Sequence, residues 1–159
     1  MANRNLATYL NDHLAGSTTA VELLDRVADI YRDITPAAIA LREEIEADRA
    51  ELRTLLKNLD VSESRTRKVG GWLAEKVTQL KLRIDDRSAG SLRLLESLEA
   101  VALGIDGKSA LWKVLDAVSP SIPPLKDLDY KRLIRRADDQ RKQLEVLRLE
   151  AGKAALVSA

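Results

Sequence analysis

Apolar and small residues recur along the first part of the chain in alternating steps of four and three. The series is Leu6, Leu10, His13, Ser17, Ala20, Leu24, Val27 and Tyr31. Because an α-helix has about 3.6 residues per turn, positions with this spacing share one face. The pattern therefore predicts a helix over residues 6–33, with one narrow packing seam that contains two polar positions.

A second helix is predicted over residues 36–59, directly after the first. Its seam has the same spacing and consists of Leu41, Ile45, Asp48, Leu52, Leu55 and Leu59. Thr35 is expected to cap the N-terminus of this helix, and Pro36 suits the first helical position. The short connection implies that the first two helices form an antiparallel hairpin.

Three further helices are predicted over residues 62–84, over residues 92–118 and from Asp127 or Asp129 to residue 157. The polar stretch 85–91 separates the third helix from the fourth. Residues 119–124 separate the fourth from the fifth, and their three prolines cannot lie inside a helix. The fourth helix has the broadest apolar surface, which indicates a central position in the fold. Its apolar residues are Leu94, Leu95, Leu98, Val101, Ala102, Ile105, Trp112 and Leu115.

These elements predict an all-α fold in which residues 1–159 form a single helical-bundle domain. If each helix reverses direction, the first, second, fourth and fifth run up, down, down and up. The third is long enough to cross the full length of the bundle at 1.5 Å per residue. With the third helix as a crossover, this is the order of a ferritin-like bundle. The alternative is a plain up-and-down bundle of five helices.

Composition narrows the functional classes. The formal net charge of +1 gives no overall attraction to nucleic acid or to an anionic membrane. No apolar run approaches the length needed to span a bilayer, and the first residues lack the apolar core of a signal peptide. The chain has no cysteine, which excludes disulfides and thiol chemistry, and its single histidine is His13. We therefore expect a cytoplasmic protein without a membrane partner.

Three stretches carry a family resemblance: NLATYLNDHLAG at 5–16, EIEAD at 44–48 and LEAVALGIDGK at 98–108. Together they resemble a family of uncharacterised bacterial helical proteins related to the ferritin-like superfamily. The resemblance implies a ferritin-like fold over most of the chain and no established activity. Diiron members of that superfamily carry Glu-x-x-His on two helices, and the chain has no such motif. We therefore expect no cofactor and no diiron chemistry.

A carboxylate site for a metal or a small ligand remains an alternative. Its candidate residues are Glu22, Glu44, Asp48, Glu99 and His13. Carboxylates on facing helices can bind a hard cation. His13 lies in the seam of the first helix, where a structural role competes with a role as ligand, base or pH switch.

Asp48 replaces an apolar residue in the second seam, so we expect it to be buried. A buried carboxylate needs a cation, several donors or a metal, and a partner from another helix fits better than Arg49 or Arg53. The simplest interpretation is an ion pair that fixes helix register. The small residues at 16–20 are expected opposite Asp48, where they allow close packing or leave a small polar pocket. Gly104 and Gly107 are expected to allow close helix packing.

The predicted third helix is locally basic and provides a second alternative, a nucleic-acid-binding face. The candidate residues are Arg65, Arg67, Lys68 and Lys76, with Trp72 as the one aromatic side chain among them. Binding would require a continuous basic surface, preferably with aromatic side chains that stack on bases. A solvated crossover helix explains the same charges more simply, so we expect no nucleic-acid partner.

The sequence as a whole predicts a non-enzymatic cytoplasmic bundle that acts through protein interaction or self-association, with a homodimer as the simplest assembly. It names neither the protein partner nor a ligand. The carboxylate site and the basic third helix are the two alternatives that the structure can address.

Overall fold

A computed structural model describes residues 4–63 and 90–157, and the described part contains four α-helices and no strand. The helices are α1 (Arg4–Ile30), α2 (Thr35–Asn58), α4 (Gly90–Val118) and α5 (Tyr130–Val157). This confirms the all-α fold and four of the predicted helices. The predicted third helix lies almost entirely outside the described residues.

The connection between α1 and α2 is as short as predicted, but Thr35 has a different role. A 3-10 turn, η1 (Arg32–Ile34), joins the helices, and Pro36 lies in the first turn of α2. The Thr35 hydroxyl does not cap α2. It donates to the carbonyl oxygen of Ala28 at 2.7 Å, because the last carbonyls of a helix have no partner within the helix.

The proline-containing segment between α4 and α5 forms two 3-10 turns, η2 (Ser119–Ser121) and η3 (Pro123–Leu125). The Asp129 carboxylate accepts a hydrogen bond from the backbone N–H of Arg132 at 2.9 Å. Asp129 therefore caps the N-terminus of α5, and it is one of the two residues, Asp127 and Asp129, predicted to begin this helix. At the other end, α4 begins at Gly90, two residues before the predicted start at Leu92.

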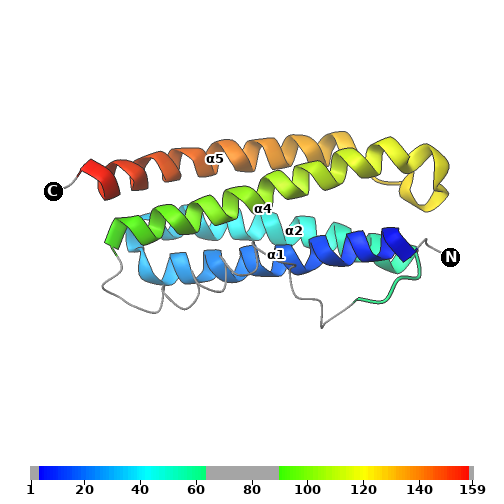
Figure 1. Cartoon of the computed structure of the whole chain (residues 1–159), viewed down its shortest axis with the longest axis horizontal. Helices are drawn as coiled ribbons and strands as arrows, with labels where there is room; N and C mark the ends of the chain where they lie inside the picture. The colour runs from blue at the N-terminus through cyan, green and yellow to red at the C-terminus, as the bar shows by residue number, and fades with distance from the viewer. Residues whose placement is uncertain (1–3, 64–89, 158–159) are drawn as a thin grey trace.

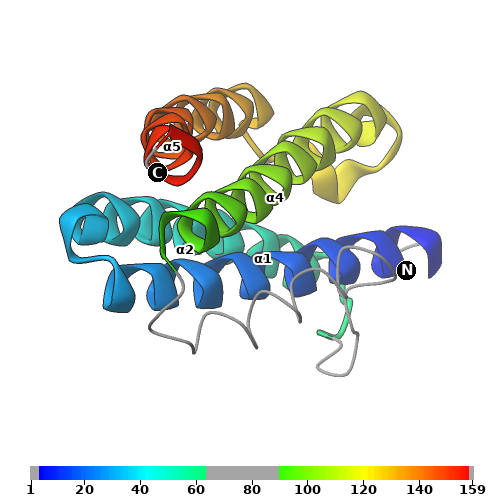
Figure 2. The same cartoon turned by 60° about the vertical axis from the view of Figure 1, so that its left-hand side comes forward.

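The four helices form two antiparallel hairpins, α1–α2 and α4–α5, that stack on each other (Figures 1 and 2). Contacts between α1 and α4 are the main link between the hairpins, and α2 and α5 add a smaller contact. Figure 1 shows α1, α2, α4 and α5 running in the predicted order of up, down, down and up. A plain five-helix bundle shares this order, and the segment that distinguishes the two topologies lies outside the described residues.

The apolar core is divided into two clusters along the bundle. One is centred on Leu24, Ile45 and Leu98, and the other on Leu55 and Trp112. Almost all of the core is Leu, Val, Ile and Ala, as the lack of phenylalanine requires. The division between the clusters lies where buried polar side chains replace apolar ones, and this level of the bundle contains the candidate site.

Candidate functional site

The Asp48 carboxylate, only 2% exposed, is the centre of the buried polar layer. It forms ion pairs with Lys108 of α4 and Arg136 of α5. The Arg136 Nε–H donates to Asp48 Oδ1 at 2.7 Å, and the amide of Gln140 donates to Oδ2 at 3.0 Å. The Lys108 ammonium also donates to the Gln140 side-chain oxygen. Three helices are thus connected through one carboxylate.

The prediction for Asp48 is confirmed in both parts: the residue is buried, and its partners come from other helices. Burial lowers the pKa of the Lys108 ammonium, and the charge of Asp48 opposes part of that shift. Removing charges from water is costly unless geometry and further hydrogen bonds compensate for it. The network provides both, since the two Asp48 oxygens accept from three side chains.

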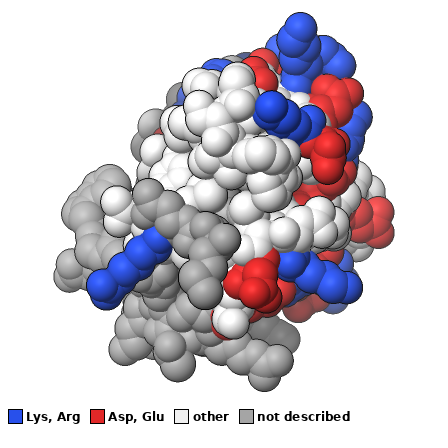
Figure 3. All heavy atoms as spheres, turned by 90° about the vertical axis from the view of Figure 1, so that its right-hand side faces the viewer, with Lys and Arg blue, Asp and Glu red and all other residues white. Residues whose placement is uncertain are grey.

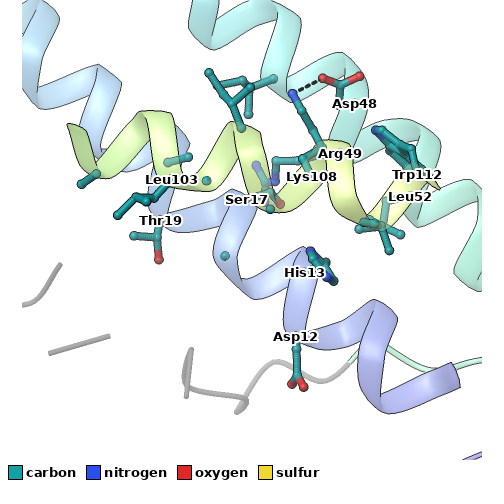
Figure 4. A pocket seen from close by; sticks show the side chains of 18 of the residues that line it. Asp12, His13, Ser17, Thr19, Asp48, Arg49, Leu52, Leu103, Lys108 and Trp112 are labelled. Carbon is teal, nitrogen blue, oxygen red and sulfur yellow. Dashed lines mark hydrogen bonds and ion pairs between the residues drawn. The ribbon is translucent and has the colours of Figure 1, made fainter. Parts of the chain in front are cut away.

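A pocket of about 350 Å³ lies at this level, between α1, α2 and α4 (Figure 4). Its polar lining includes Asp48 and Arg49 from α2 and Lys108 from α4. Most of the remaining wall is apolar, with Leu23, Leu52, Leu103, Leu111 and Trp112 among the lining residues. At roughly 30 Å³ per water molecule, the space corresponds to about a dozen waters, which is at the lower end for ligand pockets.

Glycines account for part of this space. An added Cβ at Gly16 of α1 or Gly107 of α4 would meet no described atom within 4 Å outside its own surroundings in the helix. At Gly104 it would lie 3.8 Å from the Cβ of Ala20. At Gly104 this is an ordinary contact distance that would also accommodate alanine, and at Gly107 no described residue packs closely, so the predicted close-packing role is not seen at either glycine and both line the pocket. Gly16 and Ala20 also line it together with Asp48, so a pocket opposite Asp48 is present as predicted, but its lining is mainly apolar and not polar.

Alanine at Gly107 is expected to raise the free energy of unfolding by roughly 0.5–1 kcal/mol, because glycine inside a helix is less favourable than alanine by that amount. The open space means that no packing penalty offsets the gain. Urea denaturation of the Gly107→Ala variant measures the effect. A loss of stability would show that this position is packed and that the pocket is smaller than described.

Two buried donors on the pocket wall lack an acceptor among the described residues: Arg49 Nε and Trp112 Nε1. The other nitrogens of Arg49 are used, one with Glu46 at 2.5 Å and one with the Thr18 hydroxyl at 3.0 Å. Burying a donor without an acceptor costs roughly 1–3 kcal/mol. Both nitrogens are shielded from solvent, so these two donors are an energetic cost within the packed interior beside the pocket.

His13 also lines the pocket, at the end nearer to the start of α1 (Figure 4). Its ring packs edge to face with Tyr9 at a centroid distance of 4.7 Å. Burial lowers the pKa of His13 below its ordinary value of 6.5, and the Asp12 carboxylate opposes part of the shift. Its neutral form is therefore favoured by the fold.

The His13 shift predicts a loss of stability on acidification. Between the lowered pKa of the folded state and about 6.5, the unfolded chain binds a proton that the folded protein does not, so stability falls as the pH falls. Thermal unfolding between about pH 7.5 and pH 5 should show a larger drop in the native protein than in His13→Gln. Parallel curves for the two proteins would contradict the expected contribution.

The candidate metal ligands are not gathered into one site. Glu22 and Glu99 are exposed, and Glu99 accepts a hydrogen bond from Arg148 at 3.1 Å. Glu44 is partly buried and close enough to Lys108 to oppose slightly the lowering of the Lys108 pKa, while Asp48 and His13 share the pocket. No three His, Cys, Asp or Glu side chains in residues 4–63 and 90–157 are placed to hold a metal together.

The predicted nucleic-acid residues Arg65, Arg67, Lys68 and Lys76 lie outside the described part of the chain. On the end of the molecule that Figure 3 shows, basic and acidic side chains are mixed, and a broad area carries neither. None of the described helices combines the length and apolarity that crossing a membrane requires.

Lys108, Gln140 and Arg136 are site residues that the sequence interpretation did not single out. A signal existed for two of them. Lys108 continues a seam in steps of four and three between Ile105 and Trp112, and Gln140 lies in the corresponding seam of α5. Each is a polar residue in an apolar series, as Asp48 is. Arg136 has no such signal, because it lies next to the α5 seam rather than in it.

Comparisons with protein families, with curated proteins and with solved structures find no match to this chain. The ferritin-like resemblance therefore stays a prediction, and a functional assignment has to come from the geometry of the site.

Proposed function

We propose that the protein is a non-enzymatic bundle that binds a small, largely apolar molecule in the pocket between α1, α2 and α4. The observation that carries this proposal is the pocket beside Gly16 and Gly107, where no described residue outside the helix's own turn would contact an added Cβ. The pocket is open to solvent, since Leu103 on its wall is 46% exposed. Removing apolar surface from water is favourable, and a ligand of matching size covers the apolar lining.

The composition of the lining supports the proposal. Ligand pockets are typically apolar and carry a few polar groups that orient the ligand. Here Leu23, Leu52 and Leu111 contribute apolar surface, and the Asp48 layer places polar groups at one side. The layer also connects α2, α4 and α5, so two of the three helices that enclose the pocket are held in fixed register.

Octan-1-ol is a suitable probe, because it combines a short apolar chain with one hydroxyl. The chain has two tryptophans, so Trp72→Phe leaves Trp112 on the pocket wall as the only indole reporter. We expect saturable changes in Trp112 fluorescence, lost in Gly107→Leu and retained in Gly90→Leu. Both glycines have open surroundings, but Gly90 does not line the pocket. Equal responses in the two leucine variants would contradict the proposal.

Self-association is a second candidate function, supported by exposed apolar side chains on α5. Val146 and Leu149 are 59% and 51% exposed, and Leu156 and Val157 still more so. Their spacing places them on one side of the helix. We propose a homodimer through this surface. Light scattering should report twice the chain mass for the native protein and the chain mass for Leu149→Lys, whereas a native monomer would contradict the dimer.

We also propose that the bundle is ferritin-like, bacterial and cytoplasmic. Support for the ferritin-like topology comes from the antiparallel contact of α1 with α4, because the order of helix directions fits the plain five-helix bundle equally well. Cysteine pairs engineered between α1 and α4 should oxidise readily if the crossover topology is right. Failure of those pairs to cross-link would favour the plain five-helix bundle.

A further inference from the structure

The last turns of α5 carry an outer stripe in which two opposite charges lie between apolar side chains. Val146, Glu150, Lys153 and Val157 follow one another in steps of four, three and four, and all four are exposed. Because this spacing keeps residues on one side of a helix, their side chains form one stripe. α5 packs mainly against α4, and it lies on the side of the bundle opposite α1 (Figures 1 and 2). The stripe is therefore on the outside of the described fold.

The stripe is symmetric about a point between residues 151 and 152 of α5. Three pairs of exposed residues lie at equal distances on either side of this point: Val146 and Val157, Leu149 and Ala154, and Glu150 and Lys153. In two pairs both members are apolar, and in the third an acid matches a base. When two copies of a helix pair antiparallel about a twofold axis, residues at equal distances from the axis meet, and each contact occurs twice. The stripe is thus complementary to itself in the antiparallel orientation.

We propose, on the basis of the proposed homodimer, that two copies of α5 pair antiparallel and that Glu150 and Lys153 determine this orientation. The Glu150 carboxylate of each copy accepts from the Lys153 ammonium of the other, which gives two equivalent ion pairs near the axis. Val146 and Val157 cover each other on both sides of these ion pairs. Removal of apolar surface from water favours association, and the charges fix the register.

The two charges are the reason for choosing a second copy as the partner of this stripe. An apolar partner would leave Glu150 and Lys153 at the interface without counter-charges, which is costly. A second copy in antiparallel orientation supplies the opposite charge at the required position for both. In a parallel pair, Glu150 would lie beside Glu150 and Lys153 beside Lys153, and the like charges would repel each other.

Charge reversal tests the ion pairs, with the dissociation constant of the dimer measured by sedimentation at low ionic strength. Glu150→Lys and Lys153→Glu should each raise this constant by about tenfold or more, because each places like charges opposite each other twice. The double variant Glu150→Lys/Lys153→Glu should return the constant to within about twofold of the native value, because the ion pairs form again with their charges exchanged. Asp138→Lys is the matched control. It changes the charge of an exposed α5 residue outside the symmetric stretch, and its effect should be small.

Single cysteines test the orientation, since the native chain has none. In the antiparallel pair, Val146 of one copy meets Val157 of the other, so a mixture of Val146→Cys and Val157→Cys proteins should form a disulfide-linked heterodimer. Val146→Cys alone should not cross-link, because the two copies of this residue lie about 16 Å apart along the helices at 1.5 Å per residue. That separation is too large for a disulfide.

The possible results separate this inference from the homodimer on which it rests. Efficient cross-linking of Val146→Cys with itself would overturn the antiparallel orientation and leave the homodimer standing. A native dissociation constant in both single charge reversals, or a double variant as weak as the single ones, would overturn the role of Glu150 and Lys153. A native protein that stays monomeric at every concentration would overturn the homodimer and this inference together.

Discussion

Replacing Asp48 with alanine is expected to lower the free energy of unfolding by roughly 3–5 kcal/mol, the usual result of breaking a buried ion pair. The Asp48 side chain is almost fully buried and receives Lys108, Arg136 and Gln140 at once. In Asp48→Ala, the Lys108 ammonium keeps the Gln140 oxygen but loses its ion-pair partner. Denaturant unfolding monitored by circular dichroism measures the loss.

The control for this variant is Glu63→Ala, which removes an acid of similar chemistry from the surface. The Glu63 side chain is 45% exposed and lies 3.6 Å from Arg53. Exposed ion pairs contribute at most about 1 kcal/mol, so we expect a small change. Similar denaturation midpoints for Asp48→Ala and Glu63→Ala would show that the polar layer contributes little to stability.

Truncation of Leu98 to alanine is the second large effect that we expect, with a loss of roughly 2–5 kcal/mol. Leu98 lies in the middle of one core cluster and has no exposed surface. The loss combines the transfer free energy of the removed methyl groups with the cavity that they leave. Thermal and urea unfolding measure it.

Leu92→Ala is the matched control on the same helix, since Leu92 is 51% exposed. Its effect should stay within about 0.5 kcal/mol, which is usual for surface substitutions. If Leu92→Ala were as destabilising as Leu98→Ala, the outer face of α4 would be buried in solution. The description of α4 as a helix with one exposed side would then be wrong.

The helices of the described part could be predicted because their sequence signals are local. The step pattern of α1 and α2, Pro36 at the start of α2 and the three prolines between α4 and α5 indicate where these helices lie. The role of Thr35 could not be predicted, because a hydroxyl near a helix junction can cap the following helix or bond to the preceding one. Which of these it does depends on the path of η1.

The site could be predicted in part. Asp48 interrupts an apolar seam, and that interruption indicates both burial and a need for partners. Lys108 and Gln140 interrupt their own seams in the same way, so the polar layer as a set was open to prediction. Arg136 reaches Asp48 from beside its seam, which depends on side-chain length and on the register of α5 against α2. The space beside Gly107 depends on how α1 and α4 pack against each other, which spacing within one helix does not encode.

The polar layer and the pocket have a common physical basis. Replacing a buried ion pair with apolar residues often stabilises a protein, so stability alone does not explain the Asp48 layer. Helix-interior glycines beside open space are also less favourable than alanine. Both features lie at the level of the bundle where the pocket lies. The proposed binding function at this level would account for both features.

Backbone amide NMR of the native protein during titration with octan-1-ol tests the central claim most directly. Three described glycines line the pocket, Gly16, Gly104 and Gly107, while Gly90 and Gly152 do not. We predict saturable shifts of the three lining glycine amides at one common dissociation constant, with Gly90 and Gly152 unchanged. Shifts confined to Gly90 and Gly152, or no saturable shift at any of the five, would contradict a ligand pocket between α1, α2 and α4.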